Sequence, residues 1–298
     1  MQVVPVVGVL DDWRDGVENL GSKEKFWVIV PSSGQRALFK ISRPGTCEHA
    51  SEFLAARVAR VLGVDCAEVE LAESDGAIGC LSYSIVRRDQ GDELIHGNAI
   101  LSGLLPDYDA FLSGRYPMHT VENIASSIRL TCADQERLAL RSLARLLIFD
   151  AVIGNTDRHH ENWGVVSRVS SDGMRVRSLA PLFDNASSLG RELSPAARRR
   201  QLRDRALGRY WKKATSAIRL DGVDCKVHPL DVLRRYSEIE TDLVQEELAR
   251  VREVDSHDIE SCFRVCASPA CPDDFIEFSR EMVAISLEQV KAIEVSDQ

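Results

Sequence analysis

The sequence predicts an α+β protein in two lobes, a small sheet-containing lobe over residues 1–88 and a mainly helical lobe over residues 89–298. Short runs of β-branched and aromatic residues, separated by turn residues, fill the first third of the chain. Apolar residues at helical spacing dominate the remainder. With 298 residues, 44% of them hydrophobic, the chain is long enough to bury a sizeable core.

The first lobe is predicted to hold five strands and one helix. The strands are expected at 3–10, 26–30, 37–41, 67–72 and 78–86, each bounded by turn residues. The helix follows Thr46, a candidate N-cap, and ends at Gly63. Lys40 lies in the strand before this helix and Glu52 lies on the helix itself.

The second lobe is predicted to contain a long helix, a hairpin and several later helices. The long helix covers 135–153, with Asp134 as its N-cap and Gly154 just past its end. A polar loop, 155–161, leads into strands at 163–169 and 174–180, which are joined by a Ser-Asp-Gly turn. Later helices are expected at 230–238, 242–252, 259–265 and 274–293.

Three polar residues around this hairpin have a spacing that is typical of phosphoryl transfer. Asp157 is followed five residues later by Asn162, and Asp184 comes after the second strand. The open ends of a hairpin lie side by side, so Asn162 and Asp184 are expected to converge. Phosphoryl transfer needs one carboxylate to orient and deprotonate the attacking hydroxyl, and oxygen ligands to hold Mg²⁺ on the nucleotide. The order D-x-x-x-x-N then D therefore predicts a phosphotransferase.

Other interpretations of these residues remain open at this stage. The 155–160 segment could be an ordinary capped loop, and Asp184 could belong to an ordinary turn. The paired histidines could suggest a metalloenzyme, although zinc histidines on a helix are usually three or four residues apart. Lys40 could be a solvated strand lysine, and Glu48 competes with Glu52 because it lies one turn earlier on the same helix.

The motif GNTDRHHENWG with a downstream LFDN resembles the C-terminal kinase domain of HipA-type toxin kinases. Its DRHxxN core is also similar to the catalytic loop of phosphatidylinositol 3- and 4-kinases. The resemblance implies a kinase-like fold and phosphorylation of a protein Ser or Thr by ATP and Mg²⁺. It assigns Asp157 as base and Asn162 and Asp184 as metal ligands. Asn-Ala follows Asp184 where a typical protein kinase has Phe-Gly. The swinging movement by which that segment acts as a switch in protein kinases is therefore in doubt for this chain.

The same resemblance places the nucleotide in the first lobe. Lys40 is expected to hold the phosphates with Glu52 as its partner, because E-x5-[VL]-A-x3-G fits Glu52 to Gly63. A loop before the first strand pair is similar to the phosphate-covering loop of the family, and the segment after the last strand takes the place of the adenine-binding hinge. The further residues assigned to ATP are Gly21, Ser22, Lys23, Lys25, Val86, Arg88 and His159.

Charge suggests a partner surface. The formal net charge is −9, yet residues 191–219 contain ten basic residues against two acidic ones. This run, between Arg198 and Lys213 in particular, predicts either a solvated helix or a docking site for an acidic or tRNA-associated protein substrate. An antitoxin or other regulatory partner follows from the resemblance. No apolar run of 18 residues predicts a membrane span, so a cytoplasmic protein is expected.

Two other functions and one structural question stay open. A kinase of a small molecule or lipid would fit the DRHxxN core, and a nucleotide-binding pseudokinase would serve as an interaction module. Eight scattered cysteines are expected to be reduced thiols. Cys262, Cys266 and Cys271 could form a zinc cluster, but their spacing is not a standard one.

Overall fold

The computed structural model describes residues 3–17, 25–112, 116–170 and 172–295. They form a mixed α+β fold that divides into two compact units. Unit 1 comprises Met1–Ile85, Phe183–Tyr210 and Asp255–Ile285, and unit 2 comprises Val86–Leu182, Trp211–Val254 and Ser286–Gln298. The division into lobes at residue 88 stays a prediction.

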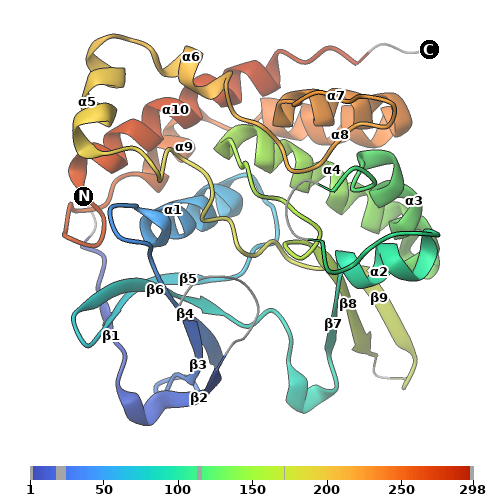
Figure 1. The fold of residues 1–298 in the computed structure, drawn as a ribbon, viewed down its shortest axis with the longest axis horizontal. Helices are drawn as coiled ribbons and strands as arrows, with labels where there is room; N and C mark the ends of the chain where they lie inside the picture. Colours follow the sequence, from blue (N-terminus) through green and yellow to red (C-terminus); the bar gives the residue numbers. More distant parts are fainter. Residues whose placement is uncertain (1–2, 18–24, 113–115, 171, 296–298) are drawn as a thin grey trace. The chain divides into compact units, whose positions relative to one another are not determined.

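Unit 1 is built on a six-stranded sheet in the order β1-β5-β6-β4-β3-β2 (Figure 1). All neighbouring strands are antiparallel except β1 and β5. The strands are β1 (Val7–Gly8), β2 (Arg14–Val17), β3 (Lys25–Ile29), β4 (Arg36–Ile41), β5 (Val69–Ser74) and β6 (Ala77–Tyr83). Helix α1 (Glu48–Val61) packs across β5 and β6.

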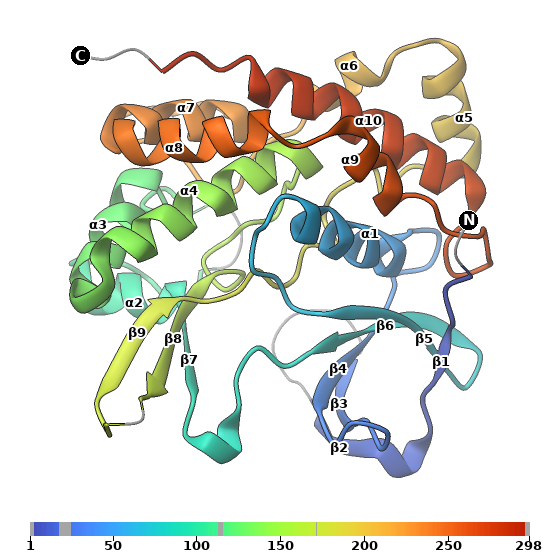
Figure 2. The same ribbon diagram turned by 180° about the vertical axis from the view of Figure 1, so that it is seen from behind.

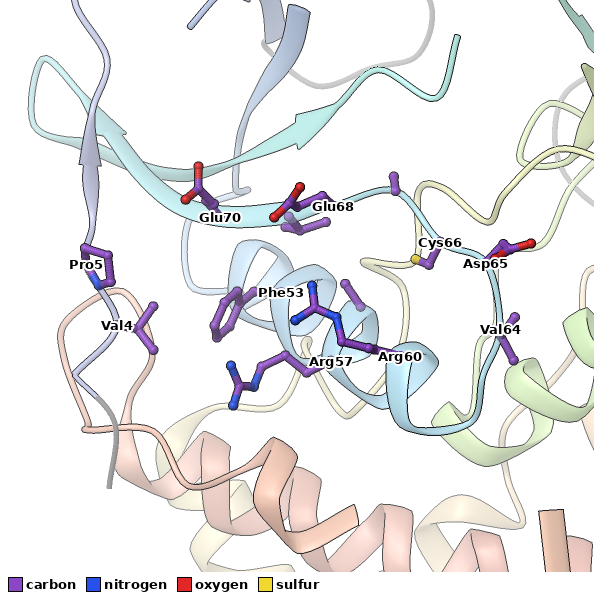
Figure 3. A pocket seen from close by; sticks show the side chains of 13 residues that line it. Val4, Pro5, Phe53, Arg57, Arg60, Val64, Asp65, Cys66, Glu68 and Glu70 are labelled. Atoms are coloured by element: carbon purple, nitrogen blue, oxygen red, sulfur yellow. The ribbon is translucent and has the colours of Figure 1, made fainter. Parts of the chain in front are cut away.

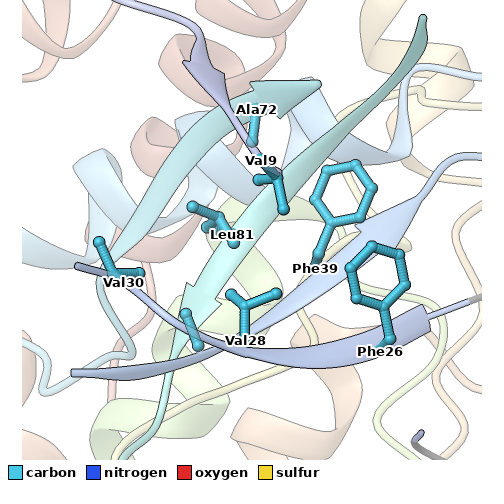
Figure 4. Packing of buried hydrophobic residues seen from close by; sticks show 8 residues of the cluster. Val9, Phe26, Val28, Val30, Phe39, Ala72 and Leu81 are labelled. Atoms are coloured by element: carbon cyan, nitrogen blue, oxygen red, sulfur yellow. The ribbon is translucent and has the colours of Figure 1, made fainter. Parts of the chain in front are cut away.

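Strand β4 is buried on both faces, and this explains the position of Lys40. Successive side chains of a strand point to opposite faces. Ala37 and Phe39 join an apolar cluster on one face of the sheet, with Phe26 and Leu81 among its members (Figure 4). Lys40 points to the other face, where α1 lies.

The remaining helices of unit 1 come from the two later segments of the chain. Helix α5 begins with Ser194, whose hydroxyl accepts a hydrogen bond from Ala197 N, and with a proline at the first helical position. Helix α9 begins after Asp255, whose carboxylate accepts from His257 N, and packs against α1. The helices are α5 (Pro195–Arg203), α6 (Leu207–Trp211), α9 (Ser256–Cys262) and α10 (Asp273–Lys291), of which α6 and α10 end in unit 2.

Unit 2 is organised around the long buried helix α4 (Glu136–Ile153). Helices α3, α7 and α8 pack against it (Figure 2). A three-stranded antiparallel sheet has the order β7-β8-β9. The other elements of unit 2 are α2 (Gly97–Leu104), α3 (Val121–Thr131), α7 (Pro229–Ile239), α8 (Thr241–Arg252), β7 (Glu93–His96), β8 (Gly164–Val169) and β9 (Arg175–Leu179), with 3₁₀ turns at Arg88–Gln90 and Ala133–Gln135. A further 3₁₀ turn, Asp11–Trp13, belongs to unit 1.

The helix at 135–153, the hairpin and the two strand pairs of the first lobe are confirmed within one or two residues at most ends. Three details were wrong. The strand expected at 3–10 is limited to Val7–Gly8. Asp134 does not cap α4, because it lies inside the preceding 3₁₀ turn. Thr46 does not cap α1, since the cap position is Cys47 and the Thr46 hydroxyl donates to Arg43 O.

Candidate active site

Unit 1 brings three of the predicted site residues together. Lys40 Nζ lies 2.8 Å from Glu52 Oε1 and 3.3 Å from Asp184 Oδ1. Burial of the ammonium group would lower its pKa, but the carboxylates of Asp184 and Glu52 outweigh this effect and raise the pKa of Lys40 above its usual value. Lys40 is therefore a fixed positive charge. Glu52, not Glu48, is its partner on α1.

The backbone that carries Asp184 is tied to α1. Ser51 Oγ donates to Ser188 O at 2.9 Å, and Ser188 Oγ donates to Asn185 O at 2.7 Å. Glu48 pairs with Arg191, with 3.0 Å between Oε1 and Nη1. Glu48 thus has a structural role at the start of α1. Residues 184–191 and α1 form one hydrogen-bonded assembly.

Unit 2 carries the other two residues on the loop after α4. The helix ends at Gly154, whose positive φ of 63° favours glycine. Arg158 is fully buried and binds Asp150 of α4 with two hydrogen bonds, at 2.9 Å from Nε and 2.7 Å from Nη2. Its Nη1 donates to Asn162 O at 2.8 Å. Arg158 therefore joins both ends of the loop to the helix.

Asp157 and Asn162 lie close together within this frame. Asp157 N donates to Asn155 Oδ1 at 3.0 Å, and Asn155 Nδ2 donates to Asp150 Oδ1 at 2.9 Å. Asn162 Nδ2 donates to Asp157 O at 2.8 Å. This bond identifies Nδ2 and therefore Oδ1 of the Asn162 amide. Among the described residues, no protein group donates a hydrogen bond to Asn162 Oδ1.

Each unit by itself offers oxygen atoms of the kind that a divalent cation prefers. Asn162 offers an amide oxygen and Asp184 a carboxylate whose side chain is one-third exposed. Mg²⁺ prefers oxygen ligands and commonly takes one or two from the protein, with phosphate and water as the rest. The Glu52 Oε2 atom is buried without a partner in the described structure, next to the Lys40 cation. Asp184 in unit 1 and Asn162 in unit 2 are therefore each of a chemical type that suits Mg²⁺, and Lys40 is of a type that suits a phosphate.

Aromatic side chains pack against the loop that carries Asp157 and Asn162. Trp163 Nε1 donates to His119 Nε2 at 3.0 Å, so His119 carries its proton on Nδ1, which donates to Ala217 O at 3.3 Å. Burial lowers the pKa of His119 to about 3. His160 Nδ1 is 2.7 Å from Tyr108 Oη, and burial lowers its pKa also. The neutral imidazoles are therefore structural groups.

The other predicted nucleotide contacts are less well defined. Gly21, Ser22 and Lys23 lie outside the described residues. Lys25 opens β3, and Val86 and Arg88 lie at the start of unit 2, half-buried and exposed respectively. His159 lies in the loop, where its Nδ1 accepts from Glu161 N at 3.2 Å. Their roles toward ATP stay predictions.

The docking role of Arg198 is contradicted by the structure. Its guanidinium group is buried, with Nε 2.7 Å from Asp274 Oδ2 of α10 and Nη1 donating to Leu193 O at 2.5 Å. Charge composition does not reveal such burial. Arg199 and Arg200, its neighbours on α5, are exposed.

The cysteines that the sequence grouped at 262–271 are free thiols, two of them buried. In the described ranges, no three His, Cys, Asp or Glu side chains form a group that could hold a metal ion. Cys262 instead accepts from Arg57 through its backbone oxygen at 2.8 Å. Cys262 therefore helps to attach α9 to α1.

A family model of the HipA-like C-terminal domain matches residues 19–253. The chain belongs to this family. The predicted resemblance is thereby confirmed. None of the curated proteins matches the chain.

Solved structures agree with the family at the level of the fold. A proinflammatory kinase of Helicobacter pylori, CtkA, matches with a TM-score of 0.75 at 17% identity, over 96% of this chain and 98% of the other. HipA of Shewanella oneidensis MR-1, solved with HipB and operator DNA, matches with a TM-score of 0.57 at 14% identity, over 96% of this chain and 70% of the other. The chain therefore has a HipA-like kinase fold, which confirms the predicted fold class. No helix among the described residues is long and apolar enough to span a membrane.

Proposed function

We propose that this chain is a cytoplasmic kinase that uses ATP and Mg²⁺ to phosphorylate a Ser or Thr hydroxyl of a protein. The observation that carries the proposal is the buried Lys40 cation held between Glu52 and Asp184. A buried lysine loses considerable side-chain entropy and hydration, so two carboxylates around it indicate a purpose beyond packing. A fixed cation next to a metal-binding carboxylate is what nucleotide phosphates require.

Each residue has one task in this proposal. Asp157 accepts the proton of the substrate hydroxyl as the oxygen bonds to the γ-phosphorus, and ADP leaves with the electron pair of the broken P–O bond. Asn162 and Asp184 would hold Mg²⁺, which would supply positive charge against the phosphates. Lys40 contacts the phosphates and Glu52 orients Lys40. Arg158, through Asp150, keeps the loop of Asp157 in place.

The family and its solved members suggest a biological setting. The Shewanella HipA belongs to a toxin–antitoxin system and was solved with HipB and operator DNA. By analogy we propose that this kinase acts as a toxin or in conflict with phage, under a regulatory partner protein. Exposed Arg199 and Arg200 would attract an acidic protein substrate by long-range electrostatics.

The test uses γ-labelled ATP, the purified chain and a cell lysate. Wild type should label protein on Ser or Thr. Asp157→Asn should lower labelling by at least about 10²-fold while Mg·ADP binding, measured by calorimetry, stays nearly unchanged. Asp184→Ala should instead weaken binding of ADP in the presence of Mg²⁺. Arg129→Lys, on the remote helix α3, is the matched control and should change neither quantity.

Each failure points to a different alternative. Wild-type turnover by Asp157→Asn would remove that residue from the base role. Mg·ADP binding without any transfer by wild type would make the chain a pseudokinase. Label that appears only in lipid or small molecules would replace the protein substrate.

A further inference from the structure

Unit 1 contains a cavity of about 590 Å³ between α1 and β5. Phe53, Arg57 and Arg60 of α1 form one side, Val69 of β5 forms another, and the chain at Pro5 closes a third (Figure 3). Ligand sites in proteins usually have volumes of about 300–1,000 Å³. None of the described residues assigned to the nucleotide lines this cavity, so it is distinct from the candidate nucleotide residues of unit 1.

The cavity opens onto a strand edge that is only partly paired. Strand β5 pairs with β6 from Val69 to Ser74. Its other edge pairs with β1 only at Ala72 and Glu73. Pro5 has no N–H, so the chain before β1 cannot donate a ladder hydrogen bond there. The first half of β5 therefore has a neighbour on one side only among the described strands.

The backbone groups of Val69 point to that open edge. Glu68 O accepts from Tyr83 N, on the β6 side, at 2.9 Å. Glu73 O accepts from Val9 N, on the β1 side, at 2.8 Å. Residues of an antiparallel strand alternate between the two sides, so Val69 shares the edge of Glu73. An open edge with its N–H and C=O groups is a template for an added strand.

The α1 side of the cavity carries one available cation. Phe53, Arg57 and Arg60 are three or four residues apart and so share one face of the helix. Arg57 is occupied, because its Nε donates to Cys262 O at 2.8 Å. Arg60 is exposed and makes no hydrogen bond or ion pair with any described residue.

The opposite face of β5 carries negative charge. The side chains of Glu68 and Glu70 lie on the side of β5 away from α1 (Figure 3). Glu70 accepts a hydrogen bond from Tyr83 Oη at 2.5 Å. Glu68 is exposed and open to a partner. Because side chains of an added strand also alternate, opposite charges on its two faces would match the two sides of this edge.

We propose that this cavity is the docking site for an extended segment of a regulatory protein, which adds to the open edge of β5. The segment places an acidic side chain toward Arg60, an apolar one toward Phe53 and a basic one toward Glu68. Backbone hydrogen bonds to Val69 provide affinity, and the alternation of charge provides specificity.

Docking here has a consequence for α1. The same helix presents Glu52 to Lys40 and the Phe53–Arg60 face to the cavity. A bound segment would cover the outer face of the helix that carries Glu52, so any effect on phosphotransfer would pass through α1. This regulatory effect rests on the proposed kinase function, whereas the docking does not.

The test uses two acetylated peptides, Lys-Glu-Lys-Val-Lys-Val and its charge-swapped counterpart Glu-Lys-Glu-Val-Glu-Val, with the isotope-labelled full chain. The first peptide should shift the amide resonance of Val69 and slow its hydrogen exchange. It should bind more tightly than the second by about two- to fivefold per charge pair, the range for exposed ion pairs. Arg60→Glu should reduce or reverse this preference, and Arg264→Glu, on an exposed site elsewhere in unit 1, should leave it unchanged.

The outcomes separate docking from catalysis. An unchanged Val69 amide with either peptide, or equal affinities in wild type, would overturn the proposal. If deletion of residues 1–4 alone makes the Val69 amide exchange faster, the chain's own amino-terminal segment is the occupant and the proposal is wrong. A peptide that binds at Val69 supports docking even where phosphotransfer is never observed, so failure of the kinase function remains distinguishable.

Discussion

The buried pair of Arg158 and Asp150 offers the sharpest perturbation of the catalytic loop. Arg158 is 1% exposed and Asp150 is 4% exposed. Arg158→Met leaves the Asp150 carboxylate buried with only the Asn155 amide as a described partner. Removing one member of a buried ion pair costs about 3–5 kcal/mol. We expect a loss of this size in the free energy of unfolding, measured with urea.

The double variant separates stability from positioning. Asp150→Leu with Arg158→Met removes both charges, and such replacements are often neutral for stability. The double variant should therefore recover most of the free energy of unfolding. It still lacks the Arg158 bond to Asn162 O and the Asp150 bond to Asn155, so the loop loses its anchors. A displacement of about 1 Å can lower turnover about 10²-fold, and we expect that order of loss.

The assay compares urea unfolding with transfer from γ-labelled ATP for both single variants and the double variant. Arg145→Met is the matched control, because Arg145 pairs with Glu247 at 2.9 Å elsewhere in unit 2 and is 30% exposed. It should cost less stability than Arg158→Met and leave turnover unchanged. Wild-type turnover by a stable double variant would refute the positioning role of Arg158.

Two further perturbations follow from buried groups. The folded chain keeps His119 neutral to about pH 3, while the unfolded chain binds a proton near pH 6.5. The contribution of His119 should therefore lower the free energy of unfolding as pH drops through 6.5, by about 1.4 kcal/mol at pH 5.5. Urea unfolding from pH 7.5 to 5 measures this, and a slope unchanged in His119→Gln would contradict it. Arg198→Leu should lower the free energy of unfolding on the order of 3 kcal/mol, because it leaves its acidic partner on α10 unpaired. Arg199→Leu, on the exposed face of the same helix, should change it by less than about 0.5 kcal/mol, and equal effects would refute the assignment.

The sequence predicted the site well where its residues lie close together along the chain. Gly154, Asp157 and Asn162 lie within nine residues, so helix ending and loop spacing could be predicted from the sequence. The pairing of Lys40 with Glu52 was predicted from the resemblance to HipA-type kinases, whereas the residue types alone left Glu48 as an alternative. The structure shows the Lys40–Glu52 pair at 2.8 Å and pairs Glu48 with Arg191 instead.

Long-range burial was not predictable in the same way. Asp150 lies within the apolar run LLIFDAVI, and a carboxylate in a buried helix was a signal that a partner such as Arg158 should exist. Arg198 was predicted to lie on an exposed docking surface, but it is buried. A count of charges cannot distinguish a buried arginine from an exposed one. Strand β7 was missed because its four residues, Glu93–His96, are too short for a clear pattern.

The hydrogen bonds between α1 and residues 184–191 bear on the design of inhibitors. Ser51 binds Ser188, and Glu48 binds Arg191, so the segment that carries Asp184 is held at two places on α1. A compound that requires this segment to swing outward while α1 stays in place would have to break both contacts in order to bind. Screening should therefore favour molecules that accept the assembled arrangement and compete directly for the surroundings of Lys40.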